Sequence, residues 1–110
     1  MSVIRSFDYP VAKSMAKHRR IRQPSKIVLA PNKKYILVIN YPLNKEYRAV
    51  VSSGRGGMTL KRLLDTIVAH YYKIYKSPRK YEIWGHGITD LAIEAMSISP
   101  KGVITLQVGS

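Results

Sequence analysis

Cysteine is absent from this chain, and acidic residues are scarce. Without thiols there is no disulfide framework, no thiolate nucleophile and no cysteine-ligated zinc. We also find neither a run of about 18 apolar residues nor a secretory signal pattern. The sequence therefore predicts an intracellular protein that is not secreted and has no membrane span.

The scarcity of carboxylates also argues against catalysis. Six carboxylates stand against 19 lysines and arginines, and the formal net charge is +13. No two carboxylates are spaced as a paired acid and base, and His18, His70 and His86 show no zinc-like spacing. We expect a protein that is not an enzyme and has no cofactor or metal. Its charge predicts an anionic partner: nucleic acid, an anionic membrane surface or an acidic protein.

One long helical pattern spans residues 60–76. Its apolar residues recur at spacings of three and four, which places them on one helix face: Leu60, Leu63, Leu64, Ile67, Tyr71, Ile74 and Tyr75. Thr59 is a suitable N-cap, and Ser77-Pro78 stops the helix. Such a stripe requires an apolar partner surface, which we expect to be a sheet.

The strand patterns predict that sheet. Residues 26–30 and 35–40 are aliphatic runs separated by a turn, which indicates a hairpin, and residues 47–52 form a third strand. Residues 103–108 alternate as a last strand. Residues 90–99 fit either a strand or a short helix, and we favour the strand. The expected fold class is α+β, an antiparallel meander sheet packed on one long helix in a single small domain.

The first 25 residues look different from the rest. They carry many cations, and a possible short helix at residues 11–21 has only a thin apolar stripe and is ended by Pro24. We predict a basic N-terminal arm over residues 1–25, outside a small α+β domain of residues 26–110. A solvated, disordered tail is the alternative. The candidate partner-binding residues of the arm are its cations: Lys13, Lys17, His18, Arg19, Arg20 and Arg22.

A second basic segment, residues 71–81, interleaves tyrosines with cations. That chemistry binds single-stranded nucleic acid, with bases on rings and phosphates on cations. The candidate residues are Lys73, Lys76, Arg79 and Lys80. The alternative, which we favour, is that Tyr71 and Tyr75 belong to the buried stripe while the cations serve the helix C-terminus.

The glycine-rich loop before the helix is a weaker candidate, for anion binding. Free amides and the helix dipole favour an anion there, and the candidate residues are Arg55, Gly56, Gly57 and Thr59. The loop matches neither the P-loop nor the dinucleotide fingerprint. A plain strand-to-helix turn explains the same glycines.

The C-terminal half carries a resemblance. Its points of likeness are residues 59–67, Tyr71-Tyr72, His86 and the closing run of residues 102–110. On these, residues 57–110 resemble a small uncharacterised domain of proteins from fungi and nucleocytoplasmic large DNA viruses. The resemblance implies a viral, non-enzymatic protein.

Together these observations predict a non-catalytic structural component of a large assembly. The expected form is a minor virion protein, associated with the capsid, whose arm docks onto neighbouring protein chains or nucleic acid. The alternative is a nucleic-acid-binding protein, such as a ribosomal protein or a small DNA-binding factor.

Overall fold

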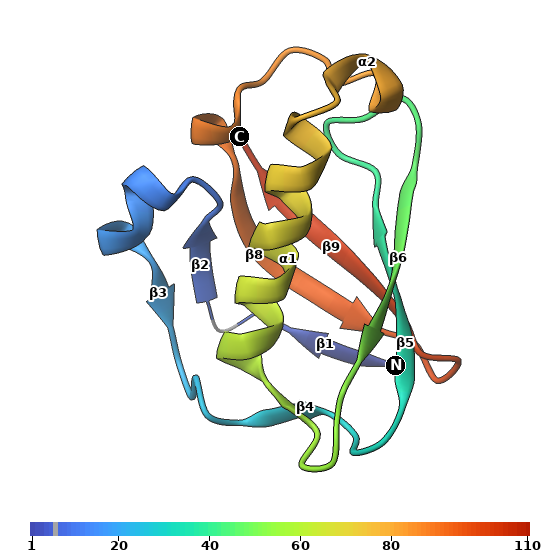
Figure 1. Cartoon of the computed structure of the whole chain (residues 1–110). Helices are drawn as coiled ribbons and strands as arrows, with labels where there is room; N and C mark the ends of the chain where they lie inside the picture. The colour runs from blue at the N-terminus through green and yellow to red at the C-terminus, as the bar shows by residue number, and fades with distance from the viewer. Residues whose placement is uncertain (6) are drawn as a thin grey trace.

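The protein is an α+β fold in which one long helix covers a mixed sheet. The computed structural model describes residues 1–5 and 7–110. Its short helical elements are η1 (Lys13–His18), α2 (Pro78–Tyr81) and η2 (Ile88–Asp90), and its long helix is α1 (Leu60–Tyr75). Figure 1 shows α1 lying across one face of the large sheet. The strands of the protein, in chain order, are β1 (Ser2–Ile4), β2 (Phe7–Pro10), β3 (Arg20–Ile21), β4 (Ile27–Leu29), β5 (Lys34–Ile39), β6 (Tyr47–Ser52), β7 (Met58–Thr59), β8 (Ala92–Ile98) and β9 (Val103–Gly109). β4 and β7 form a separate two-stranded sheet.

The prediction of α1 is confirmed. The Thr59 side chain caps the helix, its hydroxyl oxygen accepting from the Arg62 amide at 3.2 Å. The predicted apolar stripe is buried except for the half-buried Tyr75, and Val68 adds to it. A helix of this length buries such a face only against a second layer. That layer is the sheet, whose Leu37, Ile39 and Ile104 belong to the same core.

The sheet is mixed, so the predicted antiparallel meander is only partly correct. The strand order is β3-β2-β8-β9-β5-β6, and β1 also pairs with β8. The pairs β5–β6 and β8–β9 are antiparallel, whereas β5 and β9 run parallel, with Ile36 opposite Val103. The strand interpretation of residues 90–99 is confirmed by β8.

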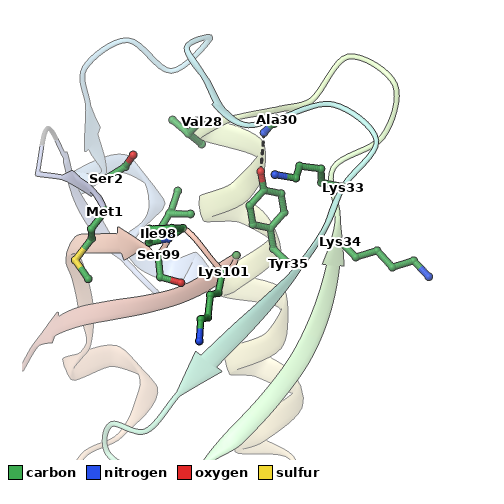
Figure 2. Close-up of a pocket in the computed structure, with 12 residues that line it drawn as sticks. Met1, Ser2, Val28, Ala30, Lys33, Lys34, Tyr35, Ile98, Ser99 and Lys101 are labelled. Carbon is green, nitrogen blue, oxygen red and sulfur yellow. Dashed lines mark hydrogen bonds between the residues drawn. The ribbon is translucent and has the colours of Figure 1, made fainter.

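The predicted hairpin between residues 26–30 and 35–40 is wrong. β4 pairs with β7, where Ile27 lies opposite Thr59, and not with β5. Two hydrogen bonds hold the loop between β4 and β5. The Ala30 amide donates to the Tyr35 hydroxyl at 2.9 Å (Figure 2), and the Asn32 amide donates to the Gly54 carbonyl at 2.7 Å. β4 itself lies beside the start of α1, where the Leu60 amide donates to the Lys26 carbonyl at 2.8 Å.

The predicted boundary at residue 25 is also wrong, because residues on both sides of it build one sheet. β1 and β2 pair antiparallel with successive parts of β8, and β3 pairs with β2. Phe7, Tyr9 and Val11 alternate with more exposed residues and are buried in the core. The side-chain period of two explains this, since every second side chain of a strand faces the same side. The segment is basic, but it is not a separate arm.

Candidate basic interface

Two basic segments that are far apart in the sequence meet on the outer side of α1. The Lys13 amide of η1 donates to the Tyr72 hydroxyl at 2.7 Å, and the Lys13 ammonium lies 5.0 Å from the Tyr72 ring centroid. Lys73 follows Tyr72 directly, and Lys76 lies one helical turn further on. The contact therefore places Lys13, at the start of η1, beside the last turns of α1, where Lys73 and Lys76 lie.

We call the exposed cations of this region the basic surface. All of its members are exposed, and none of them forms an ion pair among the described residues. They are Lys13, Lys17, Lys73 and Lys76. The only carboxylate in η1 or α1 is Asp65. Arg20 of β3 is also exposed, but it lies opposite the exposed Asp8 of β2.

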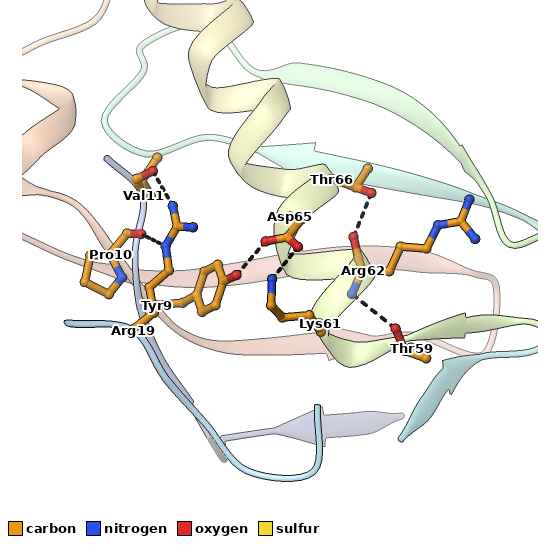
Figure 3. A network of polar contacts seen from close by, with 9 residues as sticks. All are labelled: Tyr9, Pro10, Val11, Arg19, Thr59, Lys61, Arg62, Asp65 and Thr66. Carbon is orange, nitrogen blue, oxygen red and sulfur yellow. Dashed lines mark hydrogen bonds and ion pairs between the residues drawn. The ribbon is translucent and has the colours of Figure 1, made fainter. Parts of the chain in front are cut away.

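Asp65 is already engaged within the protein. Its carboxylate accepts from the Tyr9 hydroxyl at 2.5 Å and from the Lys61 ammonium at 2.6 Å (Figure 3). Burial alone would raise the pKa of the Asp65 carboxyl, but the hydrogen bonds from Lys61 and Tyr9 outweigh it and lower that pKa. Asp65 is therefore ionised at neutral pH, and its charge is offset locally by Lys61.

Arg19, which was predicted to bind a partner, makes contacts within the protein. Its guanidinium donates to the carbonyls of Pro10 at 2.9 Å and Val11 at 3.1 Å, and it lies 4.5 Å from the Tyr9 ring centroid (Figure 3). These contacts hold the strand end of β2 against the start of β3. A half-buried cation with two carbonyl acceptors is less free to bind phosphate than an exposed lysine.

The other predicted cations lie elsewhere. Arg22 lines a separate cleft together with Arg5 and Lys26. Arg79 and Lys80 are exposed on α2, where the Lys80 ammonium lies 5.4 Å from the Tyr81 ring centroid. His18 is exposed at the end of η1. The structure thus joins part of the two predicted basic segments into one surface and separates Arg22 from it.

The buried-stripe interpretation of the two tyrosines is confirmed in its main part. Tyr71 is buried and its hydroxyl donates to the Tyr41 carbonyl at 2.9 Å. The Tyr75 hydroxyl donates to the His86 carbonyl at 3.0 Å, and burial, with smaller effects of Asp90 and Tyr41, raises the Tyr75 pKa to about 12. The Tyr71 ring is therefore not free to stack on a base, and the Tyr75 ring is half-buried.

The first three amides of α1 already have partners within the protein, so they are not available for the anion site predicted at this loop. The Leu60 amide donates to the Lys26 carbonyl at 2.8 Å, and the Lys61 amide donates to the Pro24 carbonyl at 3.0 Å. The third amide, of Arg62, donates to Thr59. Arg55 and Gly56 are exposed on the preceding turn. The interpretation of this loop as a plain strand-to-helix turn is the one that fits.

Gly57 shows why that turn needs glycine. Its φ is +78°, and an added Cβ would lie 2.5 Å from the Leu29 carbonyl oxygen. Close approach of β4 to this turn therefore requires a residue without a side chain.

The described residues contain no group of three or more His, Asp or Glu side chains that could hold a metal ion. None of the helices in this part of the chain is long and apolar enough to cross a membrane. No protein-family model, curated protein or solved structure matches this chain.

Proposed function

We propose that the protein is a non-catalytic component of a large assembly, such as a virus particle, and that its basic surface binds the phosphate backbone of nucleic acid. The contact between Lys13 and Tyr72 carries the proposal, because it gathers cations from two segments onto one face. Asp65, the one carboxylate in those segments, is engaged by Lys61 and Tyr9. The net charge of +13 adds attraction at longer range.

The composition of the surface favours a phosphate backbone over an acidic protein. Among the described residues, the large exposed apolar side chains are Met1, Val3, Ile27, Val50 and Trp84, and none of these belongs to η1 or α1. The central part of a protein interface is usually apolar and poor in charge. A surface of exposed lysines without an apolar centre fits a regular array of phosphates, bound without regard to sequence.

Binding of a fluorescein-labelled DNA duplex, measured by anisotropy over a range of salt concentrations, tests the proposal. The test variant replaces Lys17, Lys73 and Lys76 with glutamine. A matched control replaces Lys33, Lys34 and Lys101 with glutamine, which removes the same amount of charge outside the basic surface.

We expect the test variant to bind more weakly and to lose up to about 0.9 in the slope of log affinity against log salt for each phosphate contact removed. The control should keep most of the slope. Equal losses in both variants would show that net charge, and not this surface, accounts for binding, and the proposal would then fail.

A further inference from the structure

One edge of β1 is not covered by any other strand in the described part of the chain. β1 pairs with β8 along one edge, with Ser2 opposite Ile98 and Ile4 opposite Met96. Among the described residues no backbone hydrogen bond uses the other edge of β1 or joins it to β4. Free strand edges are templates for pairing with another chain, and proteins usually cover or blunt them.

A groove runs between this edge and β4. Its middle is a cleft of about 350 Å³ lined by residues 2–4 on one side and residues 26–28 on the other. A second cleft, of about 330 Å³, shares Ser2 and Val28 with the first and extends it toward Tyr35 (Figure 2). A third, of about 450 Å³, shares Val3, Ile4 and Lys26 and extends the groove the other way. The shared residues make the three clefts one continuous groove.

The middle of the groove exposes two aliphatic side chains. Val3 is 47% exposed and Ile27 is 50% exposed, although both are aliphatic residues of strands. They are two of the few large apolar side chains exposed in the described part of the chain. Aliphatic walls suit the side chains of a peptide and give no free aromatic ring for base stacking, since the Tyr35 ring is buried.

Both ends of the groove are positively charged. Arg5, Arg22 and Lys26 line one end, and among residues 1–5 and 7–110 no carboxylate lines any of the three clefts. Lys33, Lys34 and Lys101 line the other end. In Figure 2 the Lys33 side chain extends toward Tyr35 and Ala30, whereas the Lys34 ammonium points away. The charge complementary to these ends is negative.

We propose that this groove binds an extended, acidic peptide segment of a partner protein, which pairs as an added strand with the free edge of β1. Main-chain hydrogen bonds to β1 supply affinity, and alternate apolar side chains pack on Val3, Ile27 and Val28. Carboxylates of the peptide meet the cations at the two ends, which sets selectivity and speeds association. This site is separate from the basic surface and takes a different class of partner.

The probe for the test is a fluorescein-labelled peptide of alternating valine and glutamate, added to the 110-residue protein. Two control peptides isolate the two interactions. One alternates serine and glutamate and keeps the charge without the apolar side chains. The other is N-methylated on every amide, so neither of its edges can donate the main-chain hydrogen bonds of a strand pair.

Two variants with the same chemical change locate the site. Val3→Asp places a carboxylate in the groove, and Val50→Asp places one on β6, where Val50 is 58% exposed. We expect Val3→Asp to weaken peptide binding about tenfold or more, since it adds a like charge and removes an apolar contact, while Val50→Asp leaves it nearly unchanged. In ¹⁵N-labelled protein, the amides of residues 2–5 and 26–28 should shift on binding.

Replacing Lys33, Lys34 and Lys101 with glutamine should weaken peptide binding while DNA binding persists. The variant of Lys17, Lys73 and Lys76 should show the reverse. The proposal is overturned if the valine–glutamate peptide does not bind, if the N-methylated peptide binds equally well, or if Val50→Asp and Val3→Asp have equal effects. Displacement of the peptide by an oligonucleotide, with the same amides shifted, would show instead that the groove binds nucleic acid.

Discussion

Deleting residues 1–25 should unfold this protein. The deletion removes β1, β2 and β3 and exposes the whole edge of β8 with which β1 and β2 pair. It also removes Phe7, Tyr9 and Val11 from the core, where Tyr9 is 1% and Val11 is 0% exposed. A detachable basic arm would have none of these consequences.

The size of the effect follows from burial. Three such side chains contribute about 1.5 to 3 kcal/mol each when fully buried, or about 5 to 9 kcal/mol together as an upper estimate. Small domains have a total free energy of unfolding of about 5 to 15 kcal/mol. The deletion therefore removes most or all of the net stability, before the lost strand pairing is included.

Substitutions distinguish the contribution of the buried Tyr9 side chain to stability from that of the basic side chains. Tyr9→Ala should lower the free energy of unfolding by about 3 to 5 kcal/mol, because it leaves a cavity under α1. Tyr9→Phe should cost about 1 kcal/mol, since it removes only the hydrogen bond to the half-exposed Asp65. The control, Lys13→Gln with Lys17→Gln, should change stability by no more than about 0.5 kcal/mol per substitution.

The free energies of unfolding of the wild type and of these four variants are measured by urea unfolding, followed by circular dichroism and by the fluorescence of Trp84. A truncated protein that unfolds cooperatively near the wild-type midpoint would refute the reasoning. So would a Tyr9→Ala variant that loses less stability than the lysine control.

Three further predictions concern α1 and its start. Gly57→Ala should destabilise the protein by about 1 kcal/mol or more, because its φ is +78° and its Cβ would meet the Leu29 carbonyl, whereas Gly56→Ala, with no atom within 4 Å, should be nearly neutral in the same urea titration. Thr59→Ala should lower the unfolding free energy by about 0.5 to 2 kcal/mol, through loss of the helix cap. Burial, with Lys73 nearby, lowers the pKa of His70, so the unfolded state binds its proton first and stability should fall as pH drops below about 6.5. The slope of thermal midpoint against pH should be shallower there in His70→Gln, and an identical slope would contradict the assignment.

The long helix was predictable because its signals are local. The apolar period, the Thr59 cap and the Ser77-Pro78 stop all lie within or beside the helix. The strands at residues 47–52 and 103–108 were predictable for the same reason, since alternation within one strand identifies it. None of these signals depends on which element lies alongside.

Strand pairing was not predictable in the same way. Ile27 and Leu29 alternate identically whether β4 pairs with β5 or with β7. The actual choice places the Lys26 carbonyl where it accepts from the Leu60 amide, a contact between residues distant in sequence. A signal for β2 did exist, in the alternation of Phe7, Tyr9 and Val11. It was obscured by Pro10, which ends the strand, and by the cations that follow.

In the candidate site, too, the local features were predictable from the sequence and the contacts between distant residues were not. Sequence identified the cations as a class, but the residues that organise them, Tyr9 and Tyr72, act through the hydrogen bonds to Asp65 and Lys13. Arg19 looks like its neighbours in sequence, and only the two carbonyls that it reaches distinguish it. Lys33, Lys34 and Lys101 were not candidates, because the fold alone brings them to one end of a groove.

Because the fold holds the basic N-terminal segment in place, its binding to a partner costs less conformational entropy than binding by a disordered arm. A disordered arm loses backbone freedom when it binds, at about 1 to 2 kcal/mol for each residue that becomes ordered. Residues 13–18 are already held here by the contacts of Lys13 with Tyr72 and of Arg19 with β2. If the basic surface binds phosphates as we propose, only its lysine side chains lose freedom on binding, so more of the electrostatic attraction is retained as affinity. The same ordering fixes β1 beside β8 and leaves its other edge open, so the basic surface and the groove both depend on the first 25 residues being part of the sheet.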